Sequence, residues 1–313
     1  MKKAKQGAVP VPKKNLWKQI AKHWEFYVLL LPGIILTIIF KYVPMYGVQI
    51  AFRDYNPVGG FFGSPWVGLK WFERFFNNYN SIRMIKNTVL LSLYSILWTF
   101  PIPIILALLI NQVKWKKFQR VSQTILYAPH FISTMILCGM LRIFLSPYGG
   151  LISTIIQAFG GKATNLIDSA TAFRTIYISS SVWQDAGWGT IIYIATLSSV
   201  DVSLHEAARV DGATPLQRIF YIDIPELVPV IVIQLIMSFG NLMNVGFEKA
   251  YLLQTSLNKA TSEIIANYVY EQGLLKAMYS FSTAVGLFNT VVNIVLLVVV
   301  NTVCKRLSDV SFI

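Results

Sequence analysis

The sequence predicts an all-α integral membrane protein, and three observations lead to that prediction. Of the 313 residues, 55% are hydrophobic and only 13% are charged, whereas soluble domains carry about 25% charged residues. Six stretches are mostly apolar over the roughly 20 residues that a helix needs to cross a bilayer. No alternating ten-residue strands recur, which argues against a transmembrane β-barrel.

The six predicted transmembrane helices follow one another with polar loops between them. The first begins after a basic segment, lacks a small-x-small cleavage site, and is therefore interpreted as an uncleaved span. We expect the spans at residues 26–49, 87–111, 121–145, 172–200, 227–246 and 281–303. They would form one domain, 26–303, between a basic tail at 1–25 and a short C-terminal tail at 304–313.

The net charge of +13 is distributed in a way that indicates membrane orientation rather than nucleic-acid binding. Lysines crowd residues 2–22, basic residues fill 114–120 after the second span, and Lys305 and Arg306 follow the last span. These clusters lie on one side if the spans alternate. Because basic loops stay in the cytoplasm, both termini are expected there, whereas the opposite loops mix acids and bases.

The loop between the fourth and fifth spans, at about 201–226, has the pattern of two capped helices. Ser203 and Glu206 have the spacing of a capping box, so a helix is expected to begin near Ser203. Asp211-Gly212 should end it, because glycine accepts the left-handed conformation that closes a helix. We therefore expect a short helix from about Ser203 to Asp211, followed by a fixed turn.

A second short helix is predicted to begin immediately after that turn. Thr214 is a suitable N-cap, Pro215 is favoured at the first helical position, and Gln217 completes another capping box. Pro225 is expected to end this helix where the next apolar stretch begins. A helix-turn-helix at a membrane surface is typical of a docking element.

Asp185 lies well inside the fourth span, close to Trp183. A carboxylate near the centre of a membrane helix costs roughly 2.5–3.5 kcal/mol on insertion scales, so Asp185 should face protein or a wet cavity. It could line a translocation path, with Trp183 stacking on a sugar ring, or it could provide a hydrogen bond between helices. The sequence leaves both interpretations open.

The fifth span carries polar residues at helical spacing, namely Gln234, Ser238, Asn241, Asn244 and Glu248. Steps of three and four residues place all five on one helical stripe. Amides donate and accept hydrogen bonds without a fixed charge, which suits a sugar pathway. The alternative is interhelical bonding worth about 0.6 kcal/mol for each amide.

Several kinds of chemistry are missing from the sequence. No P-loop is present, since Gly160-Gly161-Lys162-Ala163 lacks the upstream glycine and the hydroxyl residue after the lysine. The three histidines and two cysteines have no metal-ligand spacing. We therefore expect no metal, no cofactor and no enzymatic activity on this chain, which would act as a conduit driven by energy from elsewhere.

The loop also resembles the EAA loop of permease subunits of binding-protein-dependent ABC importers, whose pattern is E-A-A-x-x-x-G followed later by I-x-L-P. Ile224 replaces the usual leucine before the proline. Segments at 187–193, 246–250 and 267–274 are similar to the carbohydrate branch, and to its polysaccharide-type, LplB-like permeases in particular. The loop residues that carry the resemblance are Glu206, Ala207, Ala208, Asp211, Gly212, Ala213 and Pro225.

This resemblance implies a type I importer permease with six spans in a bacterial cell membrane. The partners implied are a second permease subunit, two ATPase subunits that bind ATP and Mg²⁺, and an extracytoplasmic binding protein. The short helices would insert into a cleft on an ATPase subunit, where Glu206 makes polar contacts. The expected cargo is an oligosaccharide or a fragment of a complex glycan; the alternatives are a non-sugar solute or an ion-gradient-driven carrier.

Overall fold

The computed structural model describes residues 22–244 and 246–307, and the chain divides into two compact units, 1–49 and 50–313. The described part of the first unit is helical: α2 (Trp24–Thr37), η1 (Ile38–Tyr42) and the beginning of η2 (Val43–Phe52). Most of the predicted basic tail at 1–25, and the end of the C-terminal tail, lie outside the described residues.

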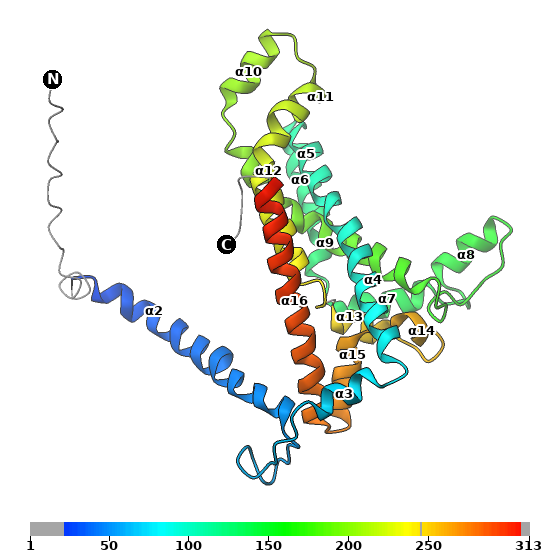
Figure 1. Cartoon of the computed structure of the whole chain (residues 1–313). Helices are drawn as coiled ribbons and strands as arrows, with labels where there is room; N and C mark the ends of the chain where they lie inside the picture. Colours follow the sequence, from blue (N-terminus) through cyan, green and yellow to red (C-terminus); the bar gives the residue numbers. More distant parts are fainter. Residues whose placement is uncertain (1–21, 245, 308–313) are drawn as a thin grey trace, which may run out of the picture. The chain divides into compact units, whose positions relative to one another are not determined.

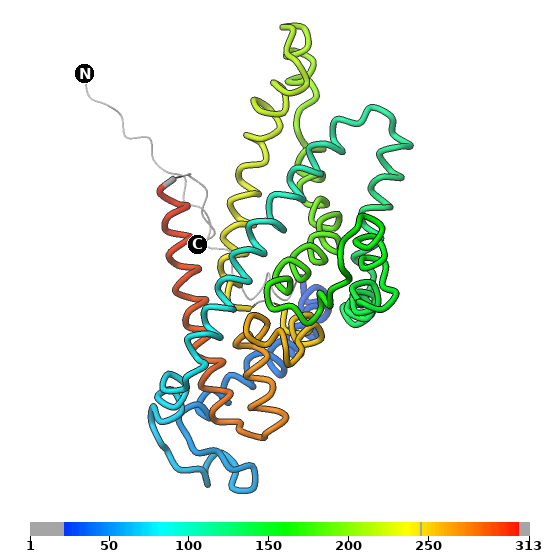
Figure 2. Tube along the Cα trace, turned by 90° about the vertical axis from the view of Figure 1, so that its right-hand side faces the viewer, coloured from blue at the N-terminus to red at the C-terminus, as the bar shows by residue number. Residues whose placement is uncertain are grey.

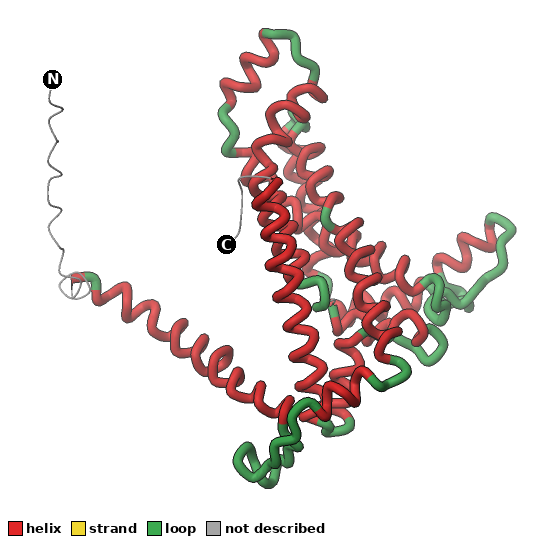
Figure 3. The backbone as a smooth tube through the Cα atoms, in the orientation of Figure 1, coloured by secondary structure: helices red, strands yellow, loops and turns green. Residues whose placement is uncertain are grey.

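The second unit is a bundle of helices joined by loops (Figures 1 and 3). Among the described residues no strand forms, and the only β contact is an isolated bridge between Arg53 and Trp66. The all-α prediction is therefore confirmed. The first half of this unit contains α3 (Lys70–Phe76), α4 (Ser81–Thr99), α5 (Pro101–Asn111), α6 (Lys116–Tyr127), η3 (Ala128–Phe131), α7 (Thr134–Phe144), α8 (Leu151–Ala158) and α9 (Phe173–Ser198).

The second half begins with two short helices at one end of the bundle and returns to long membrane helices. Figure 2 shows α10 and α11 at one end of α12, with α15 near the other end. These elements are α10 (Val202–Val210), α11 (Pro215–Arg218), η4 (Ile219–Asp223), α12 (Ile224–Gly240), α13 (Phe247–Leu253), α14 (Lys259–Ser262), α15 (Ile265–Tyr270), η5 (Glu271–Leu275) and α16 (Tyr279–Leu307).

Four helices in the described residues are long and apolar enough to cross a membrane: Trp24–Phe52, Ser81–Asn111, Pro215–Gly240 and Tyr279–Arg306. They correspond to the first, second, fifth and sixth predicted spans. The fourth predicted span is the continuous 26-residue α9, which is long enough but too polar to join that group. The predicted count of six spans is therefore not confirmed.

The third predicted span, 121–145, is sharply bent and is not one continuous helix. Lys116–Phe131 and Thr134–Phe144 meet at 93°, and together they provide at most a fifth, broken span. Pro129 lies at the start of η3, and Ile132 and Ser133 have extended backbone conformations. Ser133 then caps α7 by accepting a hydrogen bond from the Ile136 N–H, so the polypeptide begins a new helix in a new direction.

The bundle packs around α9, which lies against α5, α4, α12 and α6, while α12 also packs along α16. The approach of α6 to α9 requires glycine at position 187, because a Cβ there would collide with the Leu126 backbone. Buried Phe173 and Tyr177 of α9 pack with Leu91 of α4 and Leu253 of α13. These contacts fix α9 at the centre of the second unit.

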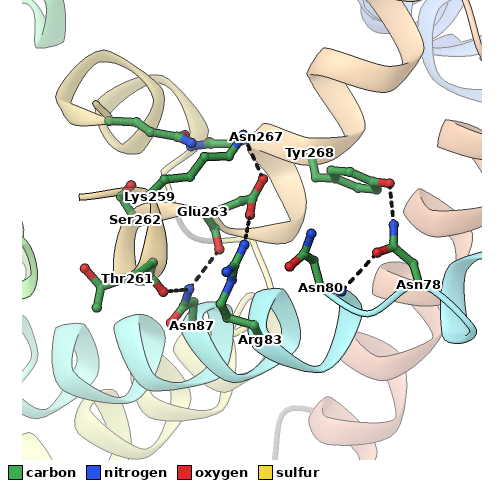
Figure 4. Close-up of polar contacts among 12 residues, drawn as sticks. Asn78, Asn80, Arg83, Asn87, Lys259, Thr261, Ser262, Glu263, Asn267 and Tyr268 are labelled. Carbon is green, nitrogen blue, oxygen red and sulfur yellow. Dashed lines mark hydrogen bonds and ion pairs between the residues drawn. The ribbon is translucent and has the colours of Figure 1, made fainter. Parts of the chain in front are cut away.

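A buried polar network attaches the start of α4 to α14 and α15 (Figure 4). Glu263 is 5% exposed and lies 2.8 Å from Arg83 and 3.2 Å from Lys259. Asn87 Nδ2 donates to the carbonyls of Ala260 and Glu263, while Asn87 Oδ1 accepts from Arg174 of α9. The segment between α12 and α16 is therefore held against α4 and α9.

Candidate functional site

A cavity of about 450 Å³ lies between α4, α7, α9, α12 and α13. Its lining is rich in hydroxyl, amide and charged side chains, because the polar positions of these helices face one another. The lining residues are Ser92, Ser95, Ile96, Thr99, Thr134, Tyr177, Ser181, Gln184, Asp185, Ser238, Asn241, Leu242, Gly246, Phe247, Glu248 and Lys249. We call this the polar cavity.

The structure brings four of the seven residues predicted for a translocation path to the polar cavity, namely Asp185, Ser238, Asn241 and Glu248. These four come from α9, α12, the turn after α12, and α13. Residues separated by more than 60 positions in the sequence therefore meet at one surface.

The other three residues of that prediction lie elsewhere. Gln234 lines a second cavity together with Trp188, Asn244 Oδ1 accepts a hydrogen bond from Asn289 Nδ2 at 2.9 Å, and Trp183 is 50% exposed. The single stripe predicted from Gln234 to Glu248 is wrong because α12 ends at Gly240. Helical periodicity cannot extend through the turn that follows.

Asp185 both lines the cavity and joins two elements. Its Oδ1 lies 2.9 Å from Nδ1 of His130 in η3, and the His130 ring stacks on Trp188 with centroids 4.4 Å apart. The two interpretations left open by the sequence are thus compatible. His130 was not identified from the sequence, and the only signal was its place next to the helix-breaking Pro129.

Lys249 was also missed. This α13 residue is 6% exposed, its Nζ donates to Ser181 Oγ at 2.9 Å, and the ammonium lies 5.3 Å from the centre of the Tyr177 ring. Burial lowers the pKa of Lys249 to about 8. Lys249 forms no ion pair with a carboxylate in the described part of the chain.

The loop at 201–226 has the predicted helix-turn-helix form, with a different first cap. Asp201, and not Ser203, caps α10: its carboxylate accepts from the Ser203 N–H at 2.9 Å, and this bond lowers the pKa of Asp201. Gly212 has φ +78°. The Gly212 N–H donates to the Arg209 backbone carbonyl, and the Ala213 N–H donates to the Ala208 backbone carbonyl. These two bonds complete the six-residue turn that closes a helix.

The second helix begins as predicted but does not end at Pro225. Thr214 and Gln217 form both bonds of the capping box, with Pro215 in the first turn. Helix then continues through the π-turn η4 into α12, giving one stretch from Pro215 to Gly240. Proline clashes with the carbonyl four residues earlier in a regular helix, and the wider π-turn directly before Pro225 relieves that clash.

The loop exposes most of the residues predicted to couple to a partner. No residue of α10 or α11 is buried; Ala208 and Ala213 are partly exposed. Exposed coupling residues are Glu206, Ala207, Asp211, Gly212 and Pro225. Apolar side chains on the same loop are also exposed, with Val202 at 66%, Val210 at 89% and Leu216 at 66%.

The described residues contain no group of three side chains arranged to hold a metal ion. Lys249, Glu248 and Asp185 are the ionisable groups of the cavity, apart from the Tyr177 phenol.

Comparisons with known proteins agree with the predicted family. The chain is 40% identical to the polygalacturonan/rhamnogalacturonan transport system permease protein YteP of Bacillus subtilis (strain 168), over 95% of this chain and 92% of that protein. It is 41% identical to protein LplB of the same organism, over 90% of this chain and 88% of that one. The resemblance to permeases of this type is thus confirmed.

The fold is shared with a solved transporter. A chain of a bacterial ABC transporter involved in the import of the acidic polysaccharide alginate superposes with a TM-score of 0.86, at 40% identity, covering 94% of this chain and 99% of that one. A second structure of a bacterial alginate ABC transporter, in complex with an alginate pentasaccharide-bound periplasmic protein, gives 0.85. Residues 79–309 match the family model, and the chain belongs to the family of binding-protein-dependent transport system inner membrane components.

Proposed function

We propose that this chain is one permease subunit of an ATP-driven importer and forms half of the translocation pathway for an oligosaccharide or a fragment of a complex glycan. The observation that carries the proposal is the polar cavity, whose amides and hydroxyls can exchange hydrogen bonds with sugar hydroxyls. Relatives named for polygalacturonan, rhamnogalacturonan and alginate support a saccharide cargo. The chain itself would be non-catalytic, with ATP and Mg²⁺ bound by partner ATPase subunits.

The charge of the cargo follows from Lys249. A buried ammonium without an ion-pair partner among the described residues favours an anionic group on the solute, because an unpaired buried charge is costly. The cavity also holds Asp185, which already faces His130, and Glu248, which is exposed. We therefore propose an acidic oligosaccharide, with Lys249 contacting its carboxylate.

The loop at 201–226 is proposed as the coupling element for the ATPase subunits. Its two helices are fixed by caps and a closed turn, so they can transmit a displacement, and their exposed apolar residues suit a cleft on a partner. Glu206 would make polar contacts there. The positive-inside rule puts this loop and both termini in the cytoplasm.

Three further components complete the proposed assembly. A second permease subunit would supply the other half of the pathway, two ATPase subunits would dimerise on the cytoplasmic face, and an extracytoplasmic binding protein would deliver the oligosaccharide. The alginate structure with its periplasmic protein supports the last of these.

A second candidate function, an ion-gradient-driven carrier, is favoured only by the His130–Asp185 pair at the cavity. Paired ionisable side chains inside a membrane bundle are typical of the proton relays of such carriers. A protonophore separates the two functions: uptake that collapses while ATP remains high would indicate the carrier, whereas uptake that requires the ATPase subunits indicates the importer.

The proposal is tested with the complete importer reconstituted in proteoliposomes, comparing Asn241→Leu with Asn244→Leu. Asn241 lines the polar cavity, whereas Asn244 is bonded to Asn289 outside the lining. We expect Asn241→Leu to reduce uptake of acidic oligosaccharides about tenfold, which corresponds to about 1.4 kcal/mol, and Asn244→Leu to have a much smaller effect. Equal effects, or equal transport of amino acids and oligosaccharides, would contradict the proposal.

A further inference from the structure

Asp223, at the end of η4, is fully buried although it carries a carboxylate. Its Oδ2 accepts a hydrogen bond from Gln112 Nε2 of the α5 C-terminus at 3.0 Å. Its Oδ1 lies 3.3 Å from His205 Nε2 of α10. Three separate segments, α10, the base of α12 and the end of α5, therefore meet at one carboxylate.

This contact is not fully satisfied in the described state. Asp223 Oδ1 is buried without a well-aligned hydrogen bond, and Arg218 Nε is likewise buried without one. Arg218 is close enough to act electrostatically on Asp223, because the π-turn brings residues five apart onto one face. Since unsatisfied buried groups are unfavourable, a small movement of α10 that aligned the His205 N–H with Asp223 would be stabilising.

Helix α10 has few other attachments to the bundle. None of its residues is buried, so little apolar packing fixes its position. Its N-cap and its closing turn hold its two ends. Among the described residues, the contact of His205 Nε2 with the Asp223 carboxylate is the one imidazole–carboxylate contact that connects α10 to another helix.

Both elements on the other side of this contact lead to the polar cavity. The α12 helix begins directly after Asp223 and carries Ser238 toward the cavity. The α5 helix, whose C-cap is Gln112, packs along α9, and α9 contributes Ser181 and Asp185 to the cavity lining. A displacement received at Asp223 would thus reach two walls of the cavity.

We infer that His205 and Asp223, with Gln112 and Arg218 beside them, form the joint through which movement of α10 is transmitted to the cavity. His205 and Asp223 are positioning residues, because neither belongs to the lining of the polar cavity. The inference rests on the proposed function of the loop as a coupling element, and it adds the residues that connect that loop to the pathway.

The test compares His205→Leu with His205→Gln in the complete reconstituted importer. Leucine removes the donor, whereas the glutamine amide can place an N–H near the position of Nε2. The readout is the number of ATP molecules hydrolysed per oligosaccharide transported. We expect His205→Leu to raise this ratio about tenfold while ATPase subunits remain bound, and His205→Gln to stay close to the unmodified ratio.

Gln119→Leu is the matched control. Gln119 Nε2 donates to the Ile110 carbonyl at the same end of α5 without reaching α10, so its loss should leave the ratio unchanged. If His205→Leu also leaves the ratio unchanged while assembly is normal, the inference is wrong. The inference is equally wrong if Gln119→Leu raises the ratio as much.

Two further experiments exchange the residues at positions 205 and 223 and measure binding of the ATPase subunits. His205→Asp combined with Asp223→His should restore the ratio relative to either single change; failure to restore it in a subunit that assembles would overturn the inference. Glu206→Gln tests the proposed function separately. If ATPase subunits bind both Glu206→Gln and a chain lacking residues 202–217 as tightly as they bind the unmodified chain, the loop is not the docking element. That conclusion does not depend on the result for His205.

Discussion

The loop at 201–226 and the polar cavity are built in opposite ways. The loop takes its shape from neighbouring residues, through the Asp201 cap, the Gly212 turn and the Thr214 capping box, and it buries none of the residues of α10 or α11. The cavity is assembled from five helices whose residues are far apart in the sequence. The loop therefore keeps its shape through contacts within itself, whereas the cavity depends on the packing of the bundle.

The strongest test of the loop is Gly212→Pro. Gly212 has φ +78°, which the proline ring forbids, and its N–H donates to Arg209. We expect uptake to fall about a hundredfold, the equivalent of about 3 kcal/mol, while the subunit remains in the membrane. Uptake and ATP hydrolysis by the reconstituted importer provide the measurement.

Gly212→Asn is its control, because asparagine tolerates the left-handed conformation better than other residues and space is open around position 212. Near-normal uptake is expected. Normal coupling in Gly212→Pro would show that the turn has no mechanical role.

For the cavity, the corresponding test is Gly187→Ala, which disturbs the packing of α9, a helix that lines the cavity, against α6. An added Cβ would collide with the Leu126 backbone where α6 meets α9. We expect the free energy of unfolding to fall by about 1–3 kcal/mol, typical of overpacking, visible as a lower melting temperature of the purified subunit. In Gly139→Ala the added Cβ meets open space in α7, so the melting temperature should not fall. An equal fall in the two variants would contradict a packing requirement at Gly187.

A smaller effect, specific to the cavity, is a pH dependence due to Lys249. Burial lowers the pKa of its ammonium to about 8, so the group is charged below that pH and neutral above it. Uptake of an acidic oligosaccharide should fall about tenfold between pH 7 and pH 9 as the charged fraction declines. Binding-protein-dependent uptake at several pH values provides the measurement.

Lys249→Arg should retain uptake and flatten this profile, because the guanidinium stays charged. Lys249→Met should lower uptake most below pH 8, where the ammonium is charged, and should also flatten the profile. A profile unchanged by both substitutions would remove Lys249 from the proposed contact with the cargo.

The smallest expected effect is that of Thr214→Ala in the loop. Thr214 accepts from the Gln217 N–H as the helix begins, and losing such a cap costs about 1 kcal/mol. Because Pro215 still favours the helix start, transport should fall only a few-fold, and Thr214→Ser should be silent. A loss as large as that of Gly212→Pro would mean that the cap contributes directly to docking.

Local signals in the sequence predicted the loop well. Gly212, Thr214, Pro215 and Gln217 behave as expected because their effects depend on residues within one turn. The first cap was assigned to Ser203 because its spacing to Glu206 fits a capping box, whereas Asp201, two residues earlier, is the cap in the structure. Pro225 does not end a helix, because a π-turn precedes it. Residue spacing in the sequence gives no sign of that π-turn.

Nonlocal arrangement was harder to predict. Apolar length identified the first, second, fifth and sixth spans, but not the sharp bend after Phe131. Ser238 and Asn241 were correctly placed together, while Asn244 was not, since periodicity does not show where α12 ends. Lys249 reaches the cavity, and His130 reaches Asp185, through tertiary packing, for which their own neighbours in sequence provide little signal.

The unbroken helix from Pro215 to Gly240 makes the short α11 helix the end of a lever. Its 26 residues span about 39 Å at about 1.5 Å per residue. A tilt of roughly 10° about the Pro215 end would displace Gly240 by about 7 Å over that length. Asn241, which follows Gly240 and lines the polar cavity, would move with it, so such a tilt would displace one wall of the cavity.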